Sequence, residues 1–422
     1  MNFFKIQLKS YFIPEPDIVS ATKKLSITDG LFWAAYSTMT TPFLVPLSIL
    51  LFGVNAPVGY ITGIPVFLVP LAQLYSVKVS QKTQNLKRMT VFITFLDRLL
   101  WIPVVFLIFI PGYYEKFVLM IALLSLRTFF ASASGTTWTL WVPTIIPSED
   151  RNTYFAKRNF IMKIFSLFGY FIALLIFAGI KDYEIALATV FLSGVAIFSS
   201  ISLYIMTRMP NFSLSNEDKV KKGKMEVDFK SFLFFVILFY LGSSMLMPYF
   251  QLYIISRDFL SLSPSYYTLI FVIISISSIM SQLKWGKLSE RWGVKKTIFV
   301  NLVILLIAII LIICSKNAIE IIIPSILYGI SQSGLGLTLF TEMIGRAKNT
   351  KIRSVSFYNL FQSLASAAGP IIANFIFVFS NSNILNVFLL SLFLLMVASI
   401  YFLSEKILLK HDRHKDKFRS SI

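Results

Sequence analysis

The chain has few of the side chains that build metal sites, disulfide frameworks and catalytic centres. Its 422 residues include one cysteine, Cys314, and two histidines, His411 and His414. A single cysteine excludes an intrachain disulfide or thiolate cluster, and histidines in the terminal tail exclude histidine acid–base chemistry inside a membrane. We therefore expect no metal and no cofactor. The sequence also lacks a phosphate-binding loop of the form GxxxxGK[ST], so we do not expect this chain to hydrolyse ATP.

Charged residues are also scarce, at 14%, whereas 56% of the residues are hydrophobic. The apolar residues form long runs, and a helix needs roughly 20 apolar residues to cross a bilayer. These runs are too long and too uniform for the alternating strands of a membrane barrel. The sequence therefore predicts an all-α membrane protein with spans at Leu31–Phe52, Ala56–Val77, Met89–Ile110, Phe117–Val142, Ile164–Ile180, Ile185–Met206, Ser231–Ser256, Pro264–Leu283, Thr297–Ser315, Ile321–Thr341, Val355–Phe379 and Ile384–Ser404.

Lysine and arginine are distributed unevenly between the two sides of these spans. If the amino terminus is cytoplasmic, 33 of the 39 basic residues fall in the inner segments. This bias is the one that the positive-inside rule describes. We therefore expect a multi-pass protein of the plasma membrane with both termini in the cytoplasm. The first apolar run is long enough to remain as a helix, so we expect no cleaved signal peptide.

The net charge of +19 raises the question of nucleic-acid binding. The excess is spread thinly over seven inner segments, and this pattern favours attraction to anionic lipids of the inner leaflet. We therefore expect membrane lipids, and no nucleic acid, among the partners.

A polar stretch near the middle of the chain divides the spans into two sets of six. Its Pro, Asn, Ser and Gly residues and mixed charges indicate a solvated linker. We predict an inner tail at 1–26, a six-helix bundle at 27–206, a linker at 207–230, a second six-helix bundle at 231–404 and a basic tail at 405–422. The inner loop after span two, from Lys78 to Arg88, has the length of the loop after span eight, which indicates an internal repeat.

The loop after span eight carries the pattern Gly286-x-Leu288-x-Glu290-Arg291-x-Gly293-x-Lys295-Lys296. This pattern resembles the loop signature of the major facilitator superfamily. Span four adds an echo of the family pattern, in which Arg127 precedes the small residues Ala131 to Gly135. The resemblance implies twelve helices in two pseudo-symmetric bundles. The first-half loop departs from the pattern, with Lys78 for the glycine and Lys82 for the acid.

The loop after span eight allows two interpretations. Independently of the family, Gly286 would allow close helix packing, and Gly293 would permit a tight turn. The resemblance implies that Glu290 acts as a latch against a helix of the opposite bundle, and that Arg291, Lys295 and Lys296 belong to the same gating loop. The alternative is a short basic turn that only fixes the topology.

Three charged residues lie within the predicted spans: Asp97, Arg98 and Arg127. An isolated charge at mid-membrane costs about 3 kcal/mol or more, so such residues normally pair or face water. Asp97 and Arg127 lie at similar depths, and we predict that they form an ion pair between spans three and four. Adjacent residues point about 100° apart on a helix, so Arg98 would point elsewhere, for example toward the inner surface. The pair could be structural, or it could serve substrate binding or proton coupling, with Arg127 as the preferred substrate contact.

Uncharged polar residues supply further candidates for a central cavity. If spans one, four, seven and ten enclose the cavity, as the resemblance implies, the substrate would meet Tyr36, Thr40, Gln251, Gln332, Asn359 and Gln362. The alternative is ordinary hydrogen bonding between helices, worth roughly 0.6 kcal/mol for each bond.

These observations favour a secondary active or facilitative transporter that moves a small solute by alternating access, and we expect it to be monomeric. Two arginines against one aspartate favour an anionic solute. A membrane enzyme acting on lipid would need clustered His, Asp or Glu, and the predicted spans contain only Asp97. The remaining alternative is a transporter-like sensor or lipid-moving protein without solute flux.

Overall fold

The computed structural model describes residues 18–53, 57–80, 82–83, 85–146, 148–211, 227–346 and 351–419. Most of the predicted inner tail at 1–26, residues 212–226 of the predicted linker and residues 420–422 of the basic tail lie outside this part. Every regular element in the described part is a helix, and twelve helical segments are long and apolar enough to cross a membrane. The predicted all-α fold with twelve spans is confirmed.

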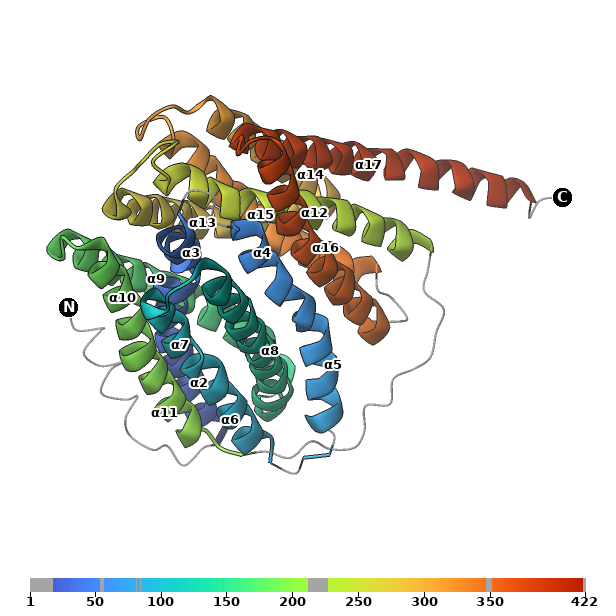
Figure 1. The fold of residues 1–422 in the computed structure, drawn as a ribbon. Coiled ribbons are helices and arrows are strands. Elements are labelled where there is room, and N and C mark those ends of the chain that lie inside the picture. The colour runs from blue at the N-terminus through green and yellow to red at the C-terminus, as the bar shows by residue number, and fades with distance from the viewer. Residues whose placement is uncertain are drawn as a thin grey trace. The chain divides into compact units, whose positions relative to one another are not determined.

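The chain forms two compact units (Figure 1). The first comprises Met1–Ala56 and Leu68–Glu217, and the second comprises Pro57–Phe67 and Asp218–Ile422. The elements of the first unit are α2 (Ile18–Thr40), η1 (Thr41–Phe43), α3 (Leu44–Phe52), α5 (Leu68–Ser80), α6 (Leu86–Leu99), α7 (Trp101–Phe106), η3 (Leu107–Phe109), α8 (Tyr113–Ile145), α9 (Ser148–Gly179), α10 (Tyr183–Ser193), η4 (Gly194–Ser199) and α11 (Ser200–Arg208).

The second unit contains the remaining helices together with the first part of span two. Its elements are α4 (Val58–Gly63), η2 (Ile64–Phe67), α12 (Val227–Ile255), α13 (Pro264–Trp292), α14 (Val294–Cys314), α15 (Ile322–Arg346), α16 (Lys351–Phe379) and α17 (Ile384–Arg419).

Several spans of the first unit are interrupted rather than continuous. Span one passes through the 3-10 segment η1, where Pro42 lacks the N–H that a continuous helix requires. Span six passes through η4, a turn of π-helix between α10 and α11. A π turn changes the hydrogen-bond register of the backbone, and such turns are frequent at functional sites. η4 packs against α2, and its first residue lies near the end of that helix, because a Cβ at Gly194 would come within 3.0 Å of Met39 Cβ.

Four spans extend well beyond the predicted boundaries. The first begins at Val19 rather than Leu31, the fifth begins at Tyr154 rather than Ile164, the eighth ends at Trp292 rather than Leu283, and the tenth ends at Arg346 rather than Thr341. Each predicted boundary lies at or close to a charged residue, whereas the helix continues past it. Some of the charged side chains in these extensions are buried, namely Asp29, Arg158, Glu342 and Arg346. The expectation of only three charges within the spans is therefore wrong.

Candidate functional site: a buried charge cluster in the first unit

The structure brings Asp97 of α6 and Arg127 of α8 together. Arg127 Nε lies 3.1 Å from Asp97 Oδ1, the distance of an ion pair, so the predicted pair is present. The Asp97 side chain is 8% exposed and that of Arg127 is 17% exposed. The arginine is therefore the more accessible partner of the pair.

Aromatic side chains position the Arg127 guanidinium. Its carbon Cζ lies 4.5 Å from the centre of the Trp101 ring, which places the cation over the negative face of the indole. Trp101 is fully buried, and its Nε1 donates a hydrogen bond of 2.7 Å to the hydroxyl of Tyr36 on α2. Three elements, α2, α7 and α8, thus hold the cation in one place.

Arg98 points away from this pair, as its position next to Asp97 on the helix predicted. Its Nη1 donates to the carbonyl of Ser199 at the end of η4, and its Nη2 donates to the hydroxyl of Ser202 at 2.9 Å. Arg98 is only 3% exposed. The alternative in which Arg98 extends to the inner surface is therefore wrong, because span six offers polar partners at mid-helix.

The Ser202 hydroxyl extends this chain of hydrogen bonds to a second carboxylate. It donates to Asp29 Oδ1 on α2, and Asp29 is 3% exposed. Arg98, Ser202 and Asp29 therefore connect α6, α11 and α2 through buried polar groups. A buried cation and a buried anion that share a neutral hydroxyl stabilise each other while each keeps a hydrogen bond.

A third arginine is buried in the first half of α9. Arg158 of α9 donates from Nε to the carbonyl of Ser26, and its guanidinium lies 4.4 Å from the centre of the Trp138 ring. Sequence reasoning missed both Arg158 and Asp29 because it placed them outside the spans. Among these residues the first unit holds two buried carboxylates, two buried guanidinium groups and the partly exposed guanidinium of Arg127, so a positive excess of one remains.

The uncharged candidates fall into two groups. Tyr36, Thr40 and Gln251 are buried and already bonded: Tyr36 accepts from Trp101, Thr40 donates to the Tyr36 carbonyl, and Gln251 accepts from the Tyr267 hydroxyl. For these three, the structure contains the hydrogen bonds within and between helices that the alternative interpretation expected. The other three are half-buried, namely Gln332, Asn359 and Gln362.

The loop after span eight is a tight turn between α13 and α14. Gly293 has φ +83°, and its N–H bonds to the Ser289 carbonyl, as expected for a helix-ending glycine. The expected close packing at Gly286 is not found, because a Cβ there would meet no atom within 4 Å. Glu290 and Arg291 are both exposed, and Lys296 lies over the Trp292 ring.

A carboxylate that the sequence analysis placed outside the spans organises this end of the second unit. Glu342 is 8% exposed, and its Oε1 lies 2.7 Å from Arg346 Nε and 3.7 Å from Lys295 Nζ. The Arg346 guanidinium lies 4.9 Å from the centre of the Phe232 ring. Lys295 of the predicted gating loop therefore pairs with Glu342, one residue beyond the predicted end of span ten.

Span two supplies a close contact with span eleven that sequence reasoning did not anticipate. Gly59 and Gly63 of α4 lie against α16: a Cβ at Gly59 would come within 2.0 Å of the Pro370 carbonyl oxygen, and one at Gly63 within 2.6 Å of the Ala367 carbonyl oxygen. The Gly59 N–H donates to Asn374 Oδ1 at 3.3 Å. This is a GxxxG contact, in which small residues let two helices approach closely, and its spacing is visible in the sequence.

Among the described residues, no group of three or more His, Cys, Asp or Glu side chains could hold a metal ion. The charge cluster of the first unit pairs guanidinium groups with carboxylates, an arrangement suited to holding or exchanging a charged partner rather than to bond-making chemistry.

Comparisons with known proteins place the fold. Residues 232–421 match the family model of the Major Facilitator Superfamily. The nucleoside transporter NupG is 14% identical, with a TM-score of 0.67 over 92% of this chain and 99% of that one. A bacterial homologue of the iron transporter ferroportin, in an inward-facing state, is 12% identical, with a TM-score of 0.69 over 92% and 99%.

A bacterial homologue of the lysosomal transporter Spinster, in an inward-facing and occupied conformation, is 14% identical, with a TM-score of 0.69 over 93% of this chain and 98% of that one. No curated protein sequence matches the chain. At these identities the structural likeness establishes the twelve-helix fold, and it says nothing about the solute.

Proposed function

We propose that the chain is a member of the major facilitator superfamily, whose model matches residues 232–421, and that it moves a small solute across the plasma membrane by alternating access between two helical bundles. The family indicates a transporter rather than an enzyme. The observation that carries the proposal is the Asp97–Arg127 pair in the middle of spans three and four. Charges at this depth are costly, and in membrane proteins they mark substrate and ion pathways.

We propose Arg127 as the first contact of the solute. It is the more exposed partner of the pair, and the Trp101 ring fixes its guanidinium. An accessible cation beside a less accessible carboxylate supports the expected preference for an anionic solute. A solute anion would compete with Asp97 for the guanidinium, and the exchange of partners would couple binding to a movement of α6 against α8.

We propose the contact between α4 and α16 as the outer gate. The positive-inside pattern places the start of span two and the end of span eleven on the outer side. The contact there is made by small residues and one hydrogen bond, and Tyr60 meets Phe375 edge-on with ring centres 5.6 Å apart. Separating such a contact costs little free energy, and a gate that opens and closes between two access states requires a contact of this kind. The Glu290 latch of the inner loop remains a proposal of the same kind for the inner side.

The remaining assignments follow from the same pattern. We propose that both termini lie in the cytoplasm and that the protein is a monomer that uses no cofactor. A reporter that functions only in the cytoplasm should be active when it is fused to either terminus.

The proposal is tested by binding and flux measured on the purified full chain. A thermal-shift screen against anions, sugars, amino acids and amphiphilic cations identifies a stabilising solute, because a ligand that binds only the folded state raises the unfolding temperature. Uptake of that solute into proteoliposomes should be lost in R127Q and partly retained in R127K. The matched control is R257Q, which removes an exposed arginine at the predicted outer side. Equal uptake by R127Q and wild type would overturn the role of Arg127, and binding without flux of any solute would favour a sensor.

A further inference from the structure

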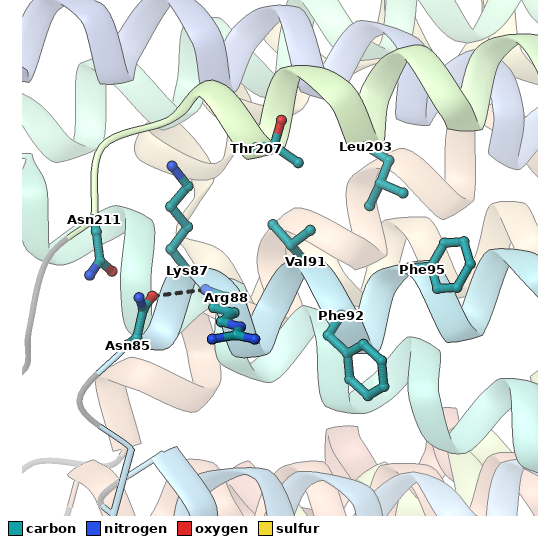
Figure 2. A pocket seen from close by; sticks show the side chains of 9 residues that line it. All are labelled: Asn85, Lys87, Arg88, Val91, Phe92, Phe95, Leu203, Thr207 and Asn211. Atoms are coloured by element: carbon teal, nitrogen blue, oxygen red, sulfur yellow. Dashed lines mark hydrogen bonds between the residues drawn. The ribbon is translucent and has the colours of Figure 1, made fainter.

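Two adjoining cavities lie between α6 and span six of the first unit. The first has a volume of about 560 Å³ and the second about 370 Å³. They share the lining residues Phe95, Leu203 and Thr207, so together they form one groove along the two helices. Figure 2 shows the first cavity, with α6 on one side and α11, which carries Leu203 and Thr207, on the other.

The walls of the groove are apolar, and its rim is exposed. The second cavity is lined by Leu99, Ile102 and Val195 among others, and the rim residues Phe92 and Tyr204 are 60% and 57% exposed. In a chain that spans a membrane, exposed apolar side chains at this depth face acyl chains. The groove therefore opens to the hydrocarbon of the bilayer rather than to water.

One end of the groove is polar and basic. Lys87 and Arg88 lie in the first turn of α6, and Asn85, Thr207 and Asn211 complete that end of the cavity. Figure 2 shows the Lys87 side chain extending from α6 toward α11 and the segment that carries Asn211. None of the described residues that line either cavity is acidic. Positive charge at this end is therefore not neutralised by the lining of the groove.

The groove also reaches a buried cation. Arg98 lines the second cavity and is 3% exposed, and its Nε has no hydrogen-bond partner although its other two nitrogens are bonded. A buried donor without a partner is destabilising. The groove thus runs from two surface cations to an arginine of the charge cluster, with apolar walls between them.

We propose that this groove binds one phospholipid with an anionic headgroup from the inner leaflet. The phosphate lies between Lys87 and Arg88, and one acyl chain follows the apolar walls between α6 and span six. The charge of the basic end complements the headgroup, and the exposed rim admits the chain sideways from the bilayer. Basic side chains near the inner surface attract anionic lipids in this way.

The bound lipid has a structural consequence. It fills the gap between the two helices that Arg98 joins through Ser199 and Ser202. Occupancy of the groove therefore stabilises the first unit.

The experiment measures lipid binding to the delipidated full chain by native mass spectrometry. Phosphatidylglycerol and phosphatidylcholine with identical acyl chains are compared. We expect wild type to retain phosphatidylglycerol preferentially, and K87Q/R88Q to bind it roughly tenfold more weakly or worse. The matched control K284Q/K287Q removes two exposed lysines from α13 and should bind as wild type does. Equal binding of both lipids, or unchanged binding by K87Q/R88Q, would overturn the proposal.

A second variant separates the groove from its basic end. L203W fills the shared part of the two cavities without changing charge, and L203F does so more mildly if the tryptophan prevents folding. Either variant should lose the bound lipid while circular dichroism shows unchanged helix content. If inorganic phosphate stabilises wild type as much as phosphatidylglycerol does, the site binds a free anion and the lipid assignment is wrong. The readout requires no solute flux, so it is independent of the proposed transport.

Discussion

The two units of the molecule bury polar groups in different ways. Both units pack helices against glycines, as at Gly169 in the first and Gly334 in the second, but only the first unit places described charged residues (Asp29, Asp97, Arg98 and Arg127) in the middle of its helices. A Cβ at Gly334 would come within 2.2 Å of Asn301, and Ser391 bonds the Gly242 carbonyl at 2.8 Å. The buried carboxylate of the second unit, Glu342, lies one turn from the end of α15.

The difference suits different roles of the two units in the proposed transport. A charge in the middle of a span costs free energy unless it is paired. In the first unit the charged side chains contact one another across α2, α6, α8 and α11. Neutral contacts between small residues are individually weak, and they suit helices that pack closely and shift as a body. Under the function proposed above, solute binding belongs to the first unit, and packing and gating belong to the second.

The largest effect should follow from Asp97→Asn. It leaves the Arg127 guanidinium buried beside a neutral amide, and breaking a buried pair in this way costs roughly 3–5 kcal/mol. Thermal unfolding of the purified protein should show a clear loss of stability in D97N. The double variant D97N/R127Q should recover part of that loss. If the two changes add without any coupling, the charges do not stabilise each other.

Glu342→Gln tests the buried charge of the second unit. The change removes the charged acceptor of Arg346 and the ion partner of Lys295, and a hydrogen bond to a charged group is worth about 1.5–3 kcal/mol. The unfolding temperature should therefore fall by less than in D97N. E290Q is the control, because Glu290 is exposed and its removal should change stability by about 0.5 kcal/mol or less. A larger loss in E290Q than in E342Q would reverse the assignment.

Gly59→Leu tests the small-residue contact between α4 and α16. The new side chain must displace the Pro370 carbonyl and the Asn374 side chain, and overpacking of this kind costs roughly 1–3 kcal/mol. In a C314S background, a cysteine at Asn374 should react faster with a thiol reagent in G59L than in the parent. The control is G179L, where a Cβ meets nothing within 4 Å. Unchanged reactivity in G59L would show that the contact does not seal this end.

Ser202→Ala tests the polar link between α2, α6 and α11, with an expected effect similar in size to that of Gly59→Leu. It removes the hydroxyl shared by Arg98 and Asp29, and the expected loss is about 1–3 kcal/mol because both charges are left with one fewer buried partner. S391A in the second unit removes a neutral hydrogen bond and should cost only about 0.6 kcal/mol. Equal losses measured by thermal unfolding would mean that the serine of the charge cluster does no more than an ordinary interhelical serine.

The number of spans and the Asp97–Arg127 pair followed from the sequence for physical reasons. Lipid demands long apolar helices, and two opposite charges at the same depth on consecutive spans have few other partners. The roles of Arg127 in binding and of Glu290 as a latch stay predictions.

The rest could not be predicted because it depends on distant segments. Asp29 lies just before the predicted start of span one, and Glu342 lies just after the predicted end of span ten. A span predicted from hydropathy ends at a charged residue, whether or not that residue is buried in the folded protein. The hydrogen-bond chain through Ser202 joins α2, α6 and α11, and only the packed structure places these three together. The GxxxG spacing of Gly59 and Gly63 is visible in the sequence, but its partner on α16 is not.

A reversible cross-link across the outer contact tests alternating access most directly. Cysteines replace Tyr60 and Phe375 in a C314S background, and a short bifunctional thiol reagent joins them. Uptake of the stabilising solute into proteoliposomes should stop when the link forms and return when a reductant cleaves it, with each single-cysteine variant unaffected. Undiminished uptake by fully cross-linked protein would contradict the account.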